Sequence, residues 1–350
     1  MTPEQLAQLH GVKLRALVKS HWPDSAAAEA STFGGGAALC DGPRGWLLIA
    51  QLRVERDPLD IAEPGESDMR PGWLGGAALW AERHGLREVH ILLDHLSPDS
   101  ARRATLLRTE PHLWRIRDRD LEAVATEPYV EPPVPPIDAL AFAGVIEAAG
   151  ADAVVEHGEL IAEVLGLEVG RVVADPERGP ALEVGVGRHD RLANAMLGGS
   201  VDSEAALRNA VEAVRAYRRP GALPHPANQL APERWLRAVV CVDPSLVGAV
   251  ALAPCAGTVP SRLKKKSPAI AIGADASGHG VVVGCSVGVD LDAPLVAADA
   301  RQAFGHAHDR LVLVVAEHDD VPALREIAAL LREPAEIAVV TRNWRDLPTG

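Results

Sequence analysis

Apolar runs separated by turn residues predict two similar series of elements along this chain. Residues 36–50 form two apolar runs on either side of Asp41-Gly42, which is typical of a β-hairpin. The elements expected after it are a helix over 73–84, a strand over 88–93, a helix over 98–108 and a strand over 112–117. The same order recurs as a hairpin over 269–289, a helix over 294–304, a strand over 310–316, a helix over 321–332 and a strand over 336–340. We therefore expect an α/β fold in which each outer module is hairpin-α-β-α-β, with small mixed sheets flanked by helices.

The remaining pattern predicts an N-terminal helix and a middle region. Residues 3–20 carry leucines at helical spacing, with Thr2 as the N-cap and Pro3 in the first turn. The middle region is expected to hold a hairpin within Arg171–Arg191. The other elements expected are helices over 138–149, 156–166, 189–197 and 203–218, and a strand over 237–242.

A proline-rich segment predicts a division into modules. Residues 127–136 hold five prolines, which exclude a helix or a central strand. The expected organisation is an N-terminal α/β module over 1–126, a Pro-rich linker over 127–137, a middle module with the acidic hairpin over 138–235 and a C-terminal α/β module over 236–350.

Composition excludes some classes of function. The net charge of −13 argues against broad, sequence-independent binding of nucleic acid, because such binding neutralises phosphates. The four cysteines form no CxxC pair and are expected to be reduced. No signal peptide is visible, and no apolar run approaches the ~18 residues of a membrane span. We expect a cytoplasmic protein that does not associate with membranes.

The middle hairpin carries the best candidate site. Asp175 and Glu183 lie at its two ends, and paired carboxylates can hold a divalent metal. This arrangement resembles the core of the restriction-endonuclease-like PD-(D/E)XK nucleases over residues 156–218. The resemblance implies that Asp175 and Glu183 bind Mg²⁺ and that Glu163, on a preceding helix, is the third acid. Where that family has a lysine this chain has Gly185, so that Arg188 or His189 would have to replace it.

Simpler interpretations stay open beside this one. Asp175 can begin a turn and Glu183 can face solvent. The acids of Asp290-Leu-Asp292 indicate a helix entry, and His306-Ala-His308-Asp309 indicates a polar turn. No phosphate-binding glycine loop or serine-hydrolase motif is present.

Three functions remain open from the sequence. The first is a nuclease-like protein with a degenerate site, acting on or near nucleic acid; if it is an enzyme, it is a metal-dependent phosphodiesterase. The second is a non-catalytic interaction or oligomerisation scaffold with a protein partner. The third is a binder of a phosphorylated small molecule through Arg188, Arg191 and the lysine loop Lys264–Lys266.

Overall fold

The computed structural model describes most of the chain, and the chain divides into two compact units. The described residues are 2–25, 30–34, 36–50, 72–175, 179–187, 190–191, 203–259, 267–306 and 308–347. The first unit comprises Met1–Tyr129, Asp290–Asp299 and Pro322–Ala335; the second comprises Val130–Val289, Ala300–Val321 and Glu336–Gly350. The expected division into three modules with a linker stays a prediction.

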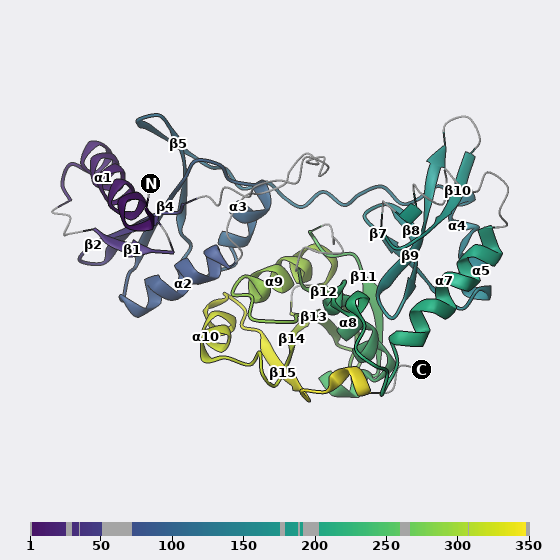
Figure 1. Ribbon diagram of the computed structural model, residues 1–350. Coiled ribbons are helices and arrows are strands. Elements are labelled where there is room, and N and C mark those ends of the chain that lie inside the picture. Colours follow the sequence, from purple (N-terminus) through teal and green to yellow (C-terminus); the bar gives the residue numbers. More distant parts are fainter. Residues whose placement is uncertain are drawn as a thin grey trace. The chain divides into compact units, whose positions relative to one another are not determined.

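The first unit is built on an N-terminal sheet with the strand order β1-β2-β3-β4-β5-β6 (Figure 1). Its strands are β1 (Ser31–Phe33), β2 (Gly36–Asp41), β3 (Arg44–Leu48), β4 (Glu88–Leu93), β5 (His112–Arg117) and β6 (Asp120–Ala123). The helices of the unit are α1 (Pro3–His21), α2 (Trp73–Arg83), α3 (Pro98–Ala104), the first part of α9 (Ala293–Phe304) and α10 (Pro322–Leu330).

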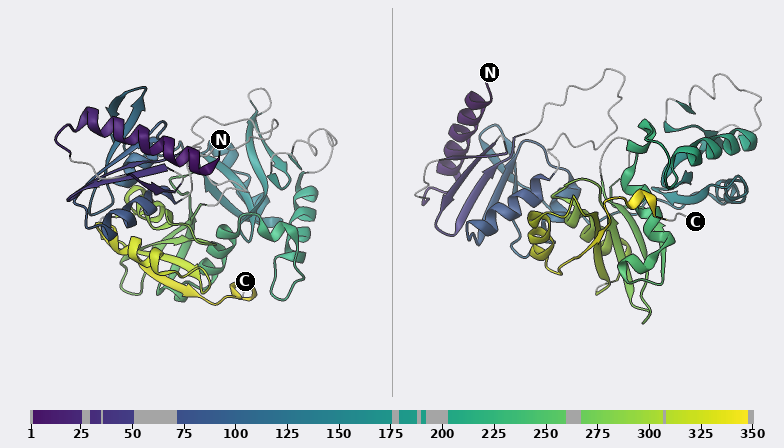
Figure 2. Two further views of the ribbon diagram at one scale, coloured as in Figure 1. Left: turned by 60° about the vertical axis from the view of Figure 1, so that its left-hand side comes forward. Right: turned by 60° about the horizontal axis from the view of Figure 1, so that its bottom comes forward.

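Helix α1 begins at the expected residue and packs on the N-terminal sheet. Thr2 and Gln5 form a capping box, in which each side chain accepts a hydrogen bond from the other residue's backbone N–H. Leu14, Leu17 and Val18 lie on one face of the helix and join the core that contains Trp46. Figure 2 shows α1 lying across the strands of this sheet.

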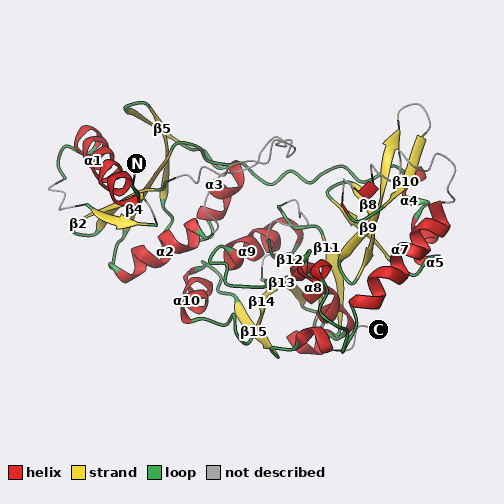
Figure 3. Ribbon diagram, viewed as in Figure 1, coloured by secondary structure: helices red, strands yellow, loops and turns green. Residues whose placement is uncertain are grey.

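The second unit contains a middle sheet with the order β10-β9-β8-β7, in which all neighbouring strands are antiparallel (Figure 3). Its strands are β7 (Asp152–Glu156), β8 (Glu159–Val164), β9 (Leu167–Asp175) and β10 (Gly179–Val184). Its helices are α4 (Ile137–Leu140), α5 (Ala143–Ala148) and α7 (Ser203–Tyr217). One face of the sheet packs against them, with Leu160, Val172 and Leu182 from the strands meeting Ile146 and Val211 from the helices.

The second unit also contains a C-terminal sheet with the order β11-β12-β13-β14-β15. Its strands are β11 (Ala251–Cys255), β12 (Ala269–Ala274), β13 (Gly280–Cys285), β14 (Arg310–Ala316) and β15 (Glu336–Val340). Helix α8 (Pro232–Val242) precedes it, with the short 3₁₀ turns η1 (Pro226–Gln229), η2 (Pro244–Val247) and η3 (Trp344–Asp346). Trp235 of α8 and Trp344 of η3 meet edge to face in the core of this sheet.

The N-terminal and C-terminal sheets have the same topology, which confirms the expected α/β fold class. In each, three antiparallel strands are followed by a helix, a parallel strand, a second helix and a second parallel strand. Strand β15 therefore corresponds to β5. The N-terminal sheet adds β6, which pairs with β5, whereas β15 is the last described strand of its sheet.

Two expected elements are wrong. Residues 156–166 form strands β7 and β8 rather than a helix, because His157 and Gly158 adopt left-handed backbone angles and turn the chain back on itself. Residues 237–242 belong to helix α8 rather than to a strand. The β-branched run at Val239 and Val240 suggested a strand, but these residues are buried on the same helical face as Trp235 and Leu236.

Two other segments of the chain concern residues that the structure does not describe. Residues 51–71, between the first expected hairpin and the helix expected over 73–84, lie outside the described residues, and so does most of the helix expected over 189–197. Among the helices that are described, none is long and apolar enough to cross a membrane.

Candidate functional site

Carboxylates gather on the face of the middle sheet that lies opposite α5 and α7. Cross-strand partners share a face of a sheet, and residues two apart on a strand do so too. The register pairs Asp152 with Glu163 and Glu156 with Glu159, and after a bulge in β9 it pairs Glu163 with Glu168. This face therefore collects acidic residues from β7, β8 and β9, while the opposite face is apolar.

Two arginines of α8 meet two of these glutamates in a buried cluster, here called the Arg–Glu cluster (Glu156, Glu163, Arg234 and Arg237). The Nη1 and Nη2 atoms of Arg237 lie 2.9 Å from Glu156 Oε1 and 2.8 Å from Glu163 Oε2. Arg234 Nη1 lies 2.9 Å from Glu163 Oε1, and its Nη2 donates to Glu156. Each carboxylate is thus bound by both guanidinium groups, and every side chain of the cluster is at most 7% exposed.

Electrostatics favour the charged form of Glu156 and Arg237. Burial alone would raise the pKa of Glu156, but the charges of Arg234 and Arg237 hold that pKa below its ordinary value. Burial also opposes the charge of Arg237, yet the two glutamates raise its pKa. At Glu163, which is fully enclosed, burial is the largest effect and raises the pKa. The carboxylates are neutralised by arginine, so that neither can bind a metal without giving up ion pairs.

A close approach of two backbones positions α8 over this face. The turn between β8 and β9 consists of Leu165 and Gly166, both with left-handed backbone angles. A Cβ at Gly166 would lie 2.3 Å from the carbonyl carbon of Arg234. Only glycine allows the helix backbone to come this near, and this contact brings Arg234 and Arg237 to the sheet.

A second group of ion pairs covers the same face nearer to β10. Arg171 binds Glu168 through Nη2 at 2.9 Å and also donates to Glu159. Arg191 Nη1 lies 2.5 Å from Glu168, and its Nε lies 3.8 Å from Glu183. Glu183, the acid expected on the second strand of the middle hairpin, therefore faces the guanidinium group of Arg191.

The structure places the predicted acids as follows. Asp175 pairs with Gly179 across the hairpin and Glu183 pairs with Arg171, so Asp175 and Glu183 lie on the same face. Their positions are four residues apart along the strands, which corresponds to about 13 Å. Glu163 was expected on a helix, and this placement is wrong: it lies on strand β8, inside the Arg–Glu cluster.

Most of the other predicted site residues cannot be placed. Arg188, His189 and the lysine loop Lys264–Lys266 lie outside the described residues. Sequence reasoning missed Arg234 and Arg237, which carry the strongest electrostatic contacts of the site. Their signal was their spacing of three residues, which places both side chains on one side of a helix.

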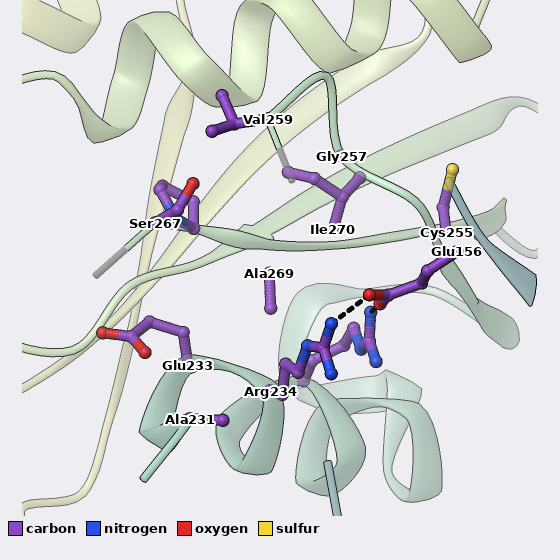
Figure 4. Close-up of a pocket in the computed structure, with 12 residues that line it drawn as sticks. Glu156, Ala231, Glu233, Arg234, Cys255, Gly257, Val259, Ser267, Ala269 and Ile270 are labelled. Atoms are coloured by element: carbon purple, nitrogen blue, oxygen red, sulfur yellow. Dashed lines mark hydrogen bonds and ion pairs between the residues drawn. The ribbon is translucent and has the colours of Figure 1, made fainter. Parts of the chain in front are cut away.

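A small pocket of about 350 Å³, part of it open to solvent, lies beside the Arg–Glu cluster (Figure 4). Figure 4 shows Glu156 and Arg234 joined at one end of it, with Cys255 next to Glu156 and Glu233 at the other end. Burial raises the pKa of the Cys255 thiol to about 11, so that this cysteine is a poor nucleophile at neutral pH.

Two acids in and after the C-terminal hairpin, Asp275 and Asp292, serve structural roles. Asp275 accepts hydrogen bonds from the backbone N–H groups of Ser277 and His279 within its own turn. Asp292 accepts hydrogen bonds from the N–H groups of Gly72 and Gly75, so this acid caps helix α2 rather than the helix that follows it in sequence. Within the described residues, no three His, Cys, Asp or Glu side chains are grouped as metal ligands.

Comparison with known proteins gives no relative: no family model, no curated protein and no solved structure matches this chain.

Proposed function

We propose that this chain is a non-catalytic scaffold that self-associates through the open edge of its C-terminal sheet. The observation that carries the proposal is the position of β15. It is the last described strand of the C-terminal sheet, at the place where β5 of the N-terminal sheet receives β6. The ion pairs of Glu163 and Glu183 support a non-catalytic role.

The backbone of β15 has hydrogen-bonding groups to offer. The N–H of Glu317 donates to the carbonyl of Val340, so Val340 points its polar backbone groups toward β14. The direction of the backbone N–H and C=O groups alternates from residue to residue along a strand. The backbone groups of Ile337 and Val339 therefore point away from β14. Val339 is also 42% exposed. Among the described residues no strand pairs with this side of β15, and an unpaired edge of this kind is a template for another strand.

A second copy of β15 is the occupant we propose. The corresponding edge in the N-terminal sheet accepts an antiparallel strand, since β6 pairs with β5 in that direction. Two copies of β15 running antiparallel use the same surface on both chains, and such contacts close into a two-fold dimer.

Sedimentation velocity over a range of concentrations tests this proposal. We expect a dimer whose formation is lost in Val339→Lys, because a lysine on an edge strand opposes strand addition. Val250→Lys is the matched control, because Val250 is 62% exposed and lies next to β11, at the opposite edge of the same sheet from β15. A wild-type protein that stays monomeric, or a Val339→Lys variant that dimerises like the wild type, would overturn the proposal.

A nuclease-like protein with a degenerate site is the second candidate. The shared face of Asp175 and Glu183 favours it. Their separation of about 13 Å along the strands and the ion pairs of Glu163 do not fit a single Mg²⁺ shell, so we derive no catalytic step from these residues.

Metal titration and cleavage assays test this second candidate. It requires that Mg²⁺ or Mn²⁺ raise the melting temperature and that Glu183→Ala abolish the rise. It also requires metal-dependent cleavage of labelled DNA or RNA. Melting temperatures that do not respond to either metal, together with intact substrates, exclude it.

A further inference from the structure

The second unit contains a larger pocket that belongs to neither proposed site. It encloses about 660 Å³, part of it open to solvent, beside the apolar face of the middle sheet. The residues lining it come from the proline-rich segment, the start of α4, the β7–β8 turn and strands β8 to β10: Pro135, Pro136, Asp138, Ala139, Gly158, Glu159, Leu160, Val172, Ala174, Gly179 and Pro180.

The pocket exists because the proline-rich segment is held against the β7–β8 turn. Gly158 has a φ of +82°, and a Cβ there would lie 2.8 Å from the carbonyl oxygen of Pro133. Glycine therefore allows the segment to run close to the sheet. Prolines in succession keep this wall extended, so it does not fold over the buried side chains of Leu160 and Val172.

The lining combines an apolar surface with negative charge. Seven of the eleven lining residues are proline, alanine, leucine or valine, and the charged ones are Asp138 and Glu159. Glu159 already pairs with Arg171. Among the lining residues that the structure describes there is no lysine, arginine or histidine. Asp138 is exposed and uses Oδ1 to accept the N–H of Ala139.

Exposed apolar side chains extend this surface along the proline-rich segment. Val134 and Ile137, which flank two lining prolines in sequence, are 76% and 84% exposed. Exposed apolar groups beside a pocket are typical of a binding surface.

We propose that this pocket binds a small primary amine with an apolar body. The apolar body covers Leu160 and Val172, and the ammonium group lies at the Asp138 carboxylate. Asp138 is the carboxylate available to a ligand, the described lining residues include no cation, and the chain as a whole is acidic, so the pocket selects against anions. The inference is independent of self-association through β15.

Ligand-observed NMR with three related probes tests this proposal. The probes are phenethylamine, 2-phenylethanol and phenylacetate, which share a ring and differ in charge. We expect phenethylamine to bind most tightly, 2-phenylethanol more weakly and phenylacetate least. Binding of phenylacetate as tight as that of the amine, or no binding of any probe, would overturn the proposal.

Two variants locate the binding. Ala174→Leu fills the pocket and is expected to abolish binding. Ala181→Leu is the matched control, because Ala181 is also an exposed strand residue but lies outside the lining. Asp138→Asn keeps an oxygen for the Ala139 N–H and should weaken amine binding about 2- to 5-fold, the range of one exposed ion pair. Unchanged amine binding by Ala174→Leu would refute this location.

Discussion

Arg237 Nη2 lies 2.8 Å from Glu163 Oε2, and both side chains are almost completely removed from water. A buried charge is tolerated only when its partners remain in place, since moving it out of water is costly. Arg237 also binds Glu156, so one guanidinium group connects two strands of the middle sheet to helix α8. This makes the Arg–Glu cluster the main polar connection between the middle sheet and the helix.

Replacing Arg237 by methionine should therefore destabilise the protein strongly. We expect Arg237→Met to lower the free energy of unfolding by about 3–5 kcal/mol, because two carboxylates lose a partner inside the fold. Arg208→Met is the matched control: Arg208 forms an exposed i,i+4 pair with Glu204, and its loss should cost under about 1 kcal/mol. Urea unfolding measures both, and equal losses would contradict the assigned role.

Gly166 should tolerate no side chain. Gly166→Ala adds a Cβ that would lie 2.3 Å from the backbone of Arg234, in addition to the strain of a φ of +74°. We expect a loss of about 2–5 kcal/mol from strain and overpacking together.

Gly179→Ala separates these two contributions. Gly179 has a φ of +81°, but a Cβ there meets no described residue within 4 Å, so only the left-handed strain of about 1–2 kcal/mol applies. If urea unfolding shows the same loss for both variants, helix α8 does not approach the β8–β9 turn as described.

The outer modules were predictable from sequence because their signals are local. The runs at 310–316 and 336–340 are short and apolar, and they became β14 and β15 with those bounds. The capping of α1 by Thr2 likewise depends on neighbouring residues. Strand β11, whose residues are partly exposed and include Pro254, gives no such signal and was missed.

The candidate site was less predictable because it depends on tertiary contacts. The residue pair Glu163–Arg237 is separated by 74 positions, and no local pattern links them. The two-residue turn at His157-Gly158 is a legitimate hairpin signal, but the apolar residues around it also fit a helical period. The placement of Glu163 on a helix was wrong for this reason.

The carboxylate of Asp292 should make stability depend on pH. Burial raises its pKa to about 6, against the opposing hydrogen bonds from Gly75 and Gly72. The folded state therefore binds this proton more tightly than the unfolded state does. The stabilisation is complete below about pH 4 and is lost as pH rises through about 6, a change on the order of 3 kcal/mol.

Asp292→Asn isolates this contribution, because asparagine does not ionise. The free energy of unfolding of the wild type, measured relative to Asp292→Asn, should fall between pH 4 and 7. A difference that stays constant over this range would show that Asp292 titrates like an exposed aspartate.

Cys285 should react with thiol reagents only when the C-terminal sheet unfolds. It lies in strand β13 with no exposed surface, and burial raises the pKa of its thiol far above the ordinary value. Because the thiolate is the reactive form and the site is closed to solvent, labelling requires global opening.

A protein that retains only Cys285, with the other cysteines replaced by alanine, should label at a rate that rises with urea as steeply as unfolding does. The matched protein that retains only Cys40, a partly exposed residue at the end of β2, should label faster without urea. Rapid labelling of Cys285 that does not depend on urea would mean that the strands around it open locally.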